Sequence, residues 1–187
     1  MNSSLPSADL VQMLRDSRRR TLALVAGLTP EQLIGPQIDI VNPLLWEIGH
    51  VAWFHEHFIL RHLDGRPSFL GNADALYDSS AVAHDQRWQL PLPSLEGTLD
   101  YMANVEAALI ARLKSERASP EETYLYQLTS FHEDMHDEAF LYSRQTLAYP
   151  APDLPDRARP ADAEAGPWPG DVEVGRASCR ERVLFAV

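Results

Sequence analysis

Apolar residues recur at intervals of three and four along four long stretches of the chain, which run over about residues 8–27, 43–63, 95–113 and 120–147. This spacing puts the apolar side chains of each stretch on one side of a helix, where they can pack against a shared core. No stretch shows a convincing alternation of apolar and polar residues, as a half-buried strand would. The pattern therefore predicts an all-α fold, a four-helix bundle.

Capping signals indicate where these helices begin. The sequences "SPEE" from Ser119 and "TPEQ" from Thr29 have the form of capping boxes, in which a hydroxyl and a side chain three residues later bond each other's backbone N–H groups. The box at Thr29 predicts a short turn between the first two long helices. Ser7 and Asn42 are the expected N-caps of the first and second long helices.

The second stretch is apolar around most of its girth, which predicts a helix sandwiched between neighbours. One face at helical spacing comprises Leu44, Ile48, Val51, His55, Phe58, Ile59 and His62, and a second stripe comprises Trp46, His50, Trp53 and His57. The run Arg18–Arg20 in the first stretch is expected on a solvated helix face.

Two segments lack helical periodicity. Residues 64–93 form a long crossover between the second and third long helices, and connections of this length are usually functional. After Pro150 the chain becomes rich in Pro, Ala and Asp, as extended linkers are, and it ends in the irregular tail "GRASCRERVLFAV". We therefore expect a helical domain over residues 1–150 and a linker with a truncated or foreign tail over residues 151–187.

Composition narrows the classes of function. The formal net charge of -11 argues against non-specific nucleic-acid binding, which needs a basic face. No apolar run is long enough to span a bilayer, and the first residues lack the basic and apolar regions of a secretory signal. Cys179 is the single cysteine, so an internal disulfide is excluded. These features predict a cytoplasmic protein.

The stretch "FHEDMHDEAF", residues 131–140, contains the candidate chemistry. His132 and His136 are four residues apart and share one helix face, so both imidazoles can reach one metal ion. The letters "HEDMH" also match the zinc-protease pattern H-E-x-x-H. We disfavour a protease, because no suitable third ligand motif follows.

A third imidazole is available from the second helix, where His50 and His57 lie on the same side. Three neutral imidazoles suit Fe(II), Zn(II), Ni(II) or Cu(II), so the ligand type leaves the metal open. The competing interpretation is that these histidines are packed core residues. Glu138 is expected either to orient a ligand imidazole from outside or to be a surface charge. Glu133 and Asp134 are expected to face solvent.

Three stretches together resemble a known family: "NPLLWEIGHVAWFHEHFILRHL", "ALYDSSAVAHDQRW" and "FHEDMHDEAFLYSRQTLAYP". Over about residues 8–175 the chain is similar to the N-terminal DinB-like helical domain of the ergothioneine-type sulfoxide synthases. In that family three histidines hold a non-haem Fe(II). The resemblance implies that the ligands here are His50, His132 and His136, which favours His50 over His57, and that Glu138 is the glutamate of the motif.

The resemblance also implies substrates. These enzymes use O₂ to join a sulfur donor to the imidazole ring of hercynine, so the expected partners are hercynine, a thiol or selenosugar donor, and O₂. Arg87 matches a position that helps to hold substrate. Met135 stands where ergothioneine-forming members carry an amide that contacts the substrate's ammonium group, and "HEDMH" is closer to the selenoneine-forming branch. Arg87 and Met135 are thus the candidate substrate-binding residues.

Family members continue into a formylglycine-generating-enzyme-like domain, which supplies a tyrosine for the chemistry. Here only "PWPGDVEV" resembles the start of that domain. We expect an N-terminal fragment that binds metal but lacks normal turnover, with its catalytic tyrosine in the missing part. Two alternatives stay open: a stand-alone DinB-like metal-dependent thiol transferase, and a helical bundle that performs no chemistry.

Overall fold

The structure, a computed structural model, describes residues 4–154. Its helices are α1 (Ser7–Val25), α2 (Pro30–Ile34), α3 (Leu44–His55), a π-helical segment (Glu56–Arg61), α4 (His62–Asp64), α5 (Ala73–Tyr77), a 3₁₀ turn (His84–Gln86), α6 (Leu95–Arg112) and α7 (Pro120–Thr146). Among these residues the only β pairing is an isolated bridge between Pro6 and Arg117. The predicted all-α fold is confirmed.

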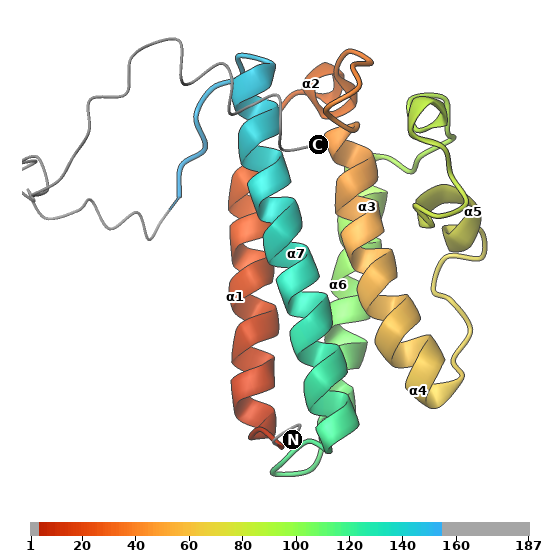
Figure 1. Ribbon diagram of the computed structural model, residues 1–187, viewed down its shortest axis with the longest axis vertical. Coiled ribbons are helices and arrows are strands. Elements are labelled where there is room, and N and C mark those ends of the chain that lie inside the picture. The colour runs from red at the N-terminus through yellow and green to blue at the C-terminus, as the bar shows by residue number, and fades with distance from the viewer. Residues whose placement is uncertain (1–3, 155–187) are drawn as a thin grey trace, which may run out of the picture. The chain divides into compact units, whose positions relative to one another are not determined.

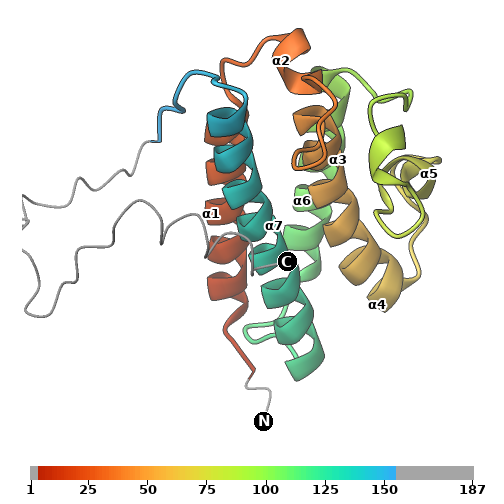
Figure 2. The same cartoon turned by 45° about the horizontal axis from the view of Figure 1, so that its top comes forward.

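The long helices α1, α3, α6 and α7 lie side by side and form the bundle (Figure 1). Helix α7 packs against α1 and α3, and α3 also packs against α6. Figure 2 shows α2 at the end of the bundle where α3 begins, with α5 against the outer side of α3. Large side chains fill the interior, among them Trp46, Tyr77, Tyr126, Phe140, Leu10 and Met102. Helix α3 is therefore enclosed by neighbours, as its apolar girth predicts.

Both predicted capping boxes are present, at Thr29 and at Ser119. The other two predicted caps are wrong. Ser7 is already the first helical residue, after Pro6, and the N-cap of α3 is Pro43. The side-chain nitrogen of Asn42 instead donates to the buried Glu47 carboxylate of α3, and its oxygen, which would have capped the helix, accepts from Arg87.

The π-helical segment continues α3 without a break and changes which side chains face inward. A π turn holds one residue more than an α turn, so the residues after it are rotated about the helix axis. His62, predicted to share one helix face with Ile48 and Val51, is 60% exposed in its side chain, whereas those two residues are buried. The prediction failed because it assumed one unbroken helical period.

The crossover over residues 64–93 is less irregular than expected, because it contains α5 and the 3₁₀ turn. Two tryptophans of α3 tie α5 in place. Trp46 donates its indole N–H to the Leu76 carbonyl at 2.7 Å, and Trp53 donates to the Asp74 carboxylate at 2.7 Å. The crossover therefore packs along α3.

A charged cluster fills the space between α1, α3 and α7. Glu133 is completely buried; it accepts from the Arg18 guanidinium at 2.8 Å and lies 2.8 Å from Nε2 of His55. Although burial opposes ionisation, Arg18 and His55 hold the pKa of the Glu133 carboxyl below its usual range. The expectation that Glu133 and Arg18 face solvent is wrong, because each charge finds its partner on a neighbouring helix. Asp134, at 38% side-chain exposure, is only partly solvated.

No helix within residues 4–154 combines the length and the apolar character needed to cross a bilayer. The linker and tail predicted for residues 151–187 lie outside the described residues, apart from residues 151–154.

Candidate metal centre

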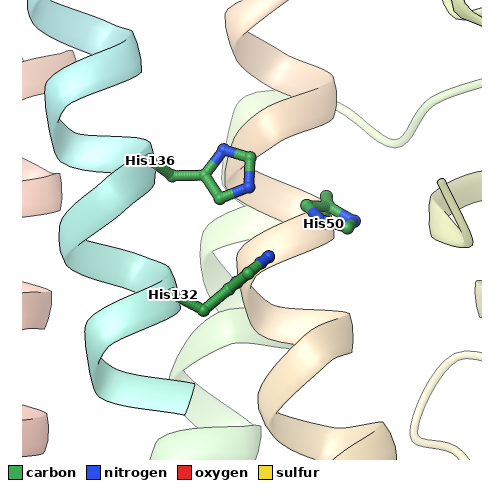
Figure 3. A group of neighbouring side chains, drawn as sticks. All are labelled: His50, His132 and His136. Carbon is green, nitrogen blue, oxygen red and sulfur yellow. The ribbon is translucent and has the colours of Figure 1, made fainter. Parts of the chain in front are cut away.

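Three imidazoles converge between α3 and α7. His50 comes from the middle of α3, and His132 and His136 come from successive turns of α7, so that the three rings point toward one another (Figure 3). One ring nitrogen of each lies within 4.8 Å of the others. In the described part of the chain, this is the only group of three or more His, Cys, Asp or Glu side chains arranged to hold a metal ion.

The orientation of His50 is set by a backbone carbonyl. Its Nδ1 lies 2.8 Å from the carbonyl oxygen of Tyr77, and because a carbonyl only accepts, the proton must be on Nδ1. Nε2 is then left with a free lone pair, as a metal ligand requires. Tyr77 can come this close because residue 49 is glycine: a Cβ there would stand 2.2 Å from the Tyr77 ring.

The imidazoles of His50 and His132 are held in the neutral form that binds metals. Burial, with the neighbouring His136, lowers the pKa of His50 to about 4. Burial, again with His136 and His50, lowers the pKa of His132 to about 2. The ring of His132 stacks on Phe54, with centroids 3.6 Å apart and ring planes at 7°. A metal entering this site would therefore not have to displace protons from His50 and His132 at neutral pH.

His136 has a carboxylate beside it. Oε2 of Glu47, a residue of α3 that is 1% exposed, lies 3.6 Å from Nδ1 of His136. Within residues 4–154 neither atom has a hydrogen-bond partner, and the buried Nδ1 of His132 also lacks one. Buried polar atoms without partners are rare in folded proteins, so their concentration here points to a ligand.

The residues present fit a divalent transition metal. The site offers three imidazole nitrogen donors, and one of them, His50, has its tautomer fixed for binding. Two nitrogens bound at about 2.1 Å to one tetrahedral ion stand about 3.4 Å apart. Separations of up to 4.8 Å thus require the rings to move inward by roughly 1 Å on binding. Three protein ligands also leave positions open for a substrate.

The other predicted site residues lie around this centre in different ways. Met135 is 54% exposed on α7, between the two histidine turns. Glu138 is exposed on the same helix, whereas Glu47 is the carboxylate beside His136. Arg87 reaches back from the crossover, with its guanidinium carbon 4.0 Å from the centre of the Trp46 ring. His57, the rival third ligand, packs against Trp53 and is not part of the histidine group.

Sequence reasoning missed Glu47 and its partner Asn42. Both are in the quoted stretch "NPLLWEIGH", three and eight residues before His50. A signal was available, since a glutamate among the apolar residues of a sandwiched helix must be buried, and a buried carboxylate needs a partner. The identity of that partner depends on how α7 packs against α3, which helical periodicity does not reveal.

Comparison with known proteins agrees with the fold. A sequence model described as the DinB superfamily matches residues 13–140. The chain is 32% identical over 132 residues to a protein of Mycobacterium tuberculosis named hercynine oxygenase, covering 68% of this chain and 30% of the relative. A hercynine oxygenase of Mycolicibacterium thermoresistibile is 31% identical over 136 residues, 72% of this chain and 30% of the relative. The chain thus spans about a third of the length of these curated relatives.

Proposed function

This chain belongs to the DinB superfamily, and on that basis we propose that it is the Fe(II)- and hercynine-binding domain of an O₂-dependent enzyme that joins a sulfur or selenium donor to the imidazole of hercynine. The observation that carries the proposal is the convergence of three imidazoles, from α3 and α7, in a domain similar to two hercynine oxygenases.

The chain's own residues have distinct tasks in this proposal. His50, His132 and His136 hold the metal and leave the remaining positions for substrate. Iron, when bound, supplies the redox chemistry that a reaction with O₂ requires. Met135 lies on the exposed side of α7 between the ligands, where it can contact a substrate that approaches from solvent. An unbranched thioether adapts its shape to a bulky ligand and adds no charge.

Arg87 is proposed to hold a carboxylate of hercynine or of the donor. Its guanidinium has five N–H donors and uses one on Nη1 for Asn42 and one on Nη2 for the Val82 carbonyl, so donors remain for a ligand. Because the matched part of this chain covers only 30% of each relative, the proposal assigns metal and substrate binding to this chain and not the whole reaction.

The test is a ligand titration on the metal-loaded chain. Loaded anaerobically with Co(II) as a spectroscopic substitute for Fe(II), the chain is expected to change its visible absorption saturably with hercynine, and the His50→Ala variant is expected not to respond. Histidine, which lacks the trimethylammonium group, is the control ligand and is expected to bind more weakly. A metal-loaded chain that does not respond to hercynine would contradict the proposal, and a response only to thiols would favour a thiol transferase.

A further inference from the structure

We propose that Glu47 is a positioning residue that fixes the proton of His136 on Nδ1, and that Asn42 and Arg87 fix Glu47 in the orientation for this task. Nε2 of His136 is then the nitrogen presented to the metal. This inference rests on the metal site proposed above, though not on the identity of the substrate.

The first step is the pair of unpartnered atoms. Glu47 uses Oε1 to accept from the amide of Asn42 at 2.7 Å, which leaves Oε2 free to face Nδ1 of His136. The separation of 3.6 Å is longer than a hydrogen bond. Both atoms are buried and, in the part of the chain described, both lack partners. Closing this gap to the length of a hydrogen bond requires a shift of about 0.5 Å, which the proposal assigns to a rotation of the imidazole when a metal binds.

The second step is the direction of each hydrogen bond. Nη1 of Arg87 lies 2.7 Å from the side-chain oxygen of Asn42. A guanidinium only donates, so the Asn42 atom that faces it must be the oxygen, and the amide nitrogen must face Glu47. The donors therefore run in one order, from Arg87 to Asn42 to Glu47. The last carboxylate oxygen can only accept, and the group that faces it must be an N–H of His136.

The third step is what holds the start of this chain of bonds. Arg87 lies over the Trp46 ring at 4.0 Å and donates to the Val82 carbonyl at 3.3 Å. A guanidinium held by an aromatic face, a carbonyl and an amide has little freedom to turn. The crossover between α3 and α6 therefore contributes to the site, because it places Arg87 against Asn42 and Trp46 at the start of α3.

The test uses a substitution that keeps the shape of Glu47 and changes the order of donors. In Glu47→Gln, Asn42 still presents its N–H₂, so the new amide must accept there with its oxygen and turn its own N–H₂ toward Nδ1 of His136. This favours the tautomer protonated on Nε2, which cannot bind a metal through Nε2. We expect the affinity for Co(II), measured by competition with a chelator, to fall about 10–100-fold.

A matched double variant restores the order without restoring the residue. In Asn42→Asp/Glu47→Gln the carboxylate and amide exchange places, and the formal charge is unchanged. The carboxylate at position 42 accepts from Arg87 and from the new amide, whose oxygen then faces His136. We expect Co(II) affinity within about threefold of wild type, because two coupled changes cancel. A role in packing alone would not be restored in this way.

A spectroscopic readout does not depend on how the variants fold. In the wild-type chain loaded with Zn(II), the side-chain ¹⁵N resonances of His136 are expected to show the proton on Nδ1, and a proton on Nε2 would overturn the inference. So would Glu47→Gln binding Co(II) as tightly as wild type, or the double variant binding as weakly as Glu47→Gln. A wild-type chain that binds neither Co(II) nor Zn(II) would instead overturn the metal site itself.

Discussion

Two faces of the same turn of α7 hold polar side chains in opposite states. On one face, Glu133 and Asp137 are buried against α1, and the Thr21 hydroxyl lies 2.8 Å from an oxygen of each. On the other, His132 and His136 are half-buried and each has an Nδ1 without a partner among residues 4–154. Most carboxylate oxygens on the first face have hydrogen-bond partners within the protein, whereas Nδ1 of each histidine on the second face has none in the part of the chain described.

The difference separates a structural cluster from a binding site. Buried charges are tolerated when counter-charges and hydrogen bonds compensate them, as Arg18 and His55 do for Glu133. Buried imidazole nitrogens without partners carry a desolvation cost, and binding a metal would offset it at the nitrogens that become ligands. Both faces contain ionisable residues of the same motif. Whether such a residue is structural or binds a ligand is therefore indicated by its hydrogen-bond partners more than by its residue type.

The largest expected effect is on the structural face. Glu133→Gln leaves the Arg18 guanidinium buried without its counter-ion, which should lower the free energy of unfolding by about 3–5 kcal/mol. Urea denaturation of the metal-free chain measures this. Glu138→Gln, an exposed change on the same helix, is the control and should stay within about 0.5 kcal/mol of wild type. Equal stabilities for the two variants would show that the buried pair does not stabilise the bundle.

The next effect is on the binding face. A metal that binds only the folded chain should raise the free energy of unfolding by about 2.7 kcal/mol when its free concentration is 100 times the dissociation constant. His132→Ala removes one of the three ligands and should abolish this increment. Denaturation with and without Co(II) tests both statements. An undiminished increment in the variant would place the metal elsewhere.

The smallest effect is a pH dependence from Asp137. Burial raises the pKa of its carboxyl to about 7, and since the single proton of the Thr21 hydroxyl cannot serve both carboxylates, a protonated Asp137 completes the pair of bonds. A pKa raised in the folded state means that stability is complete below the unfolded value of 3.8 and is lost as the pH rises toward 7.

Asp137→Asn removes the contribution of this carboxyl to the pH dependence of stability, while the contributions of the histidines are the same in both proteins. The difference in unfolding free energy between variant and wild type should therefore shift in favour of the variant by about 2 kcal/mol from pH 5 to pH 7. Denaturation at several pH values measures the difference. A constant difference across this range would show that Asp137 titrates as an ordinary surface carboxyl.

The sequence was sufficient for those features that depend on neighbouring residues. The helical stretches, the boxes at Thr29 and Ser119, and the shared face of His132 and His136 follow from local spacing and are present in the structure. That His50 joins them required the family resemblance, because periodicity alone left His57 as an equal choice. Metal binding by the three imidazoles and the role of Glu138 remain predictions.

The features that sequence reasoning missed depend on contacts between helices. Glu133 looks like a surface residue until α1 places Arg18 against it, and Asn42 looks like a cap until Glu47 and Arg87 are beside it. The exposure of His62 follows from the π-helical segment. The residues of that segment gave no indication in the sequence that the α-helical period would change there. A helical period identifies residues that share a face but not the charge on the helix opposite.

The most direct test of the three-histidine centre is anaerobic Fe(II) binding by the wild-type chain and by single histidine variants. The wild-type chain and His57→Ala, which alters the rival imidazole of the same helical stretch, are expected to bind one equivalent. His50→Ala, His132→Ala and His136→Ala are each expected to lose at least about 100-fold in affinity, because removing a ligand costs more than removing the group that orients one. Unchanged binding in those three variants, or its loss in His57→Ala, would contradict the centre described here.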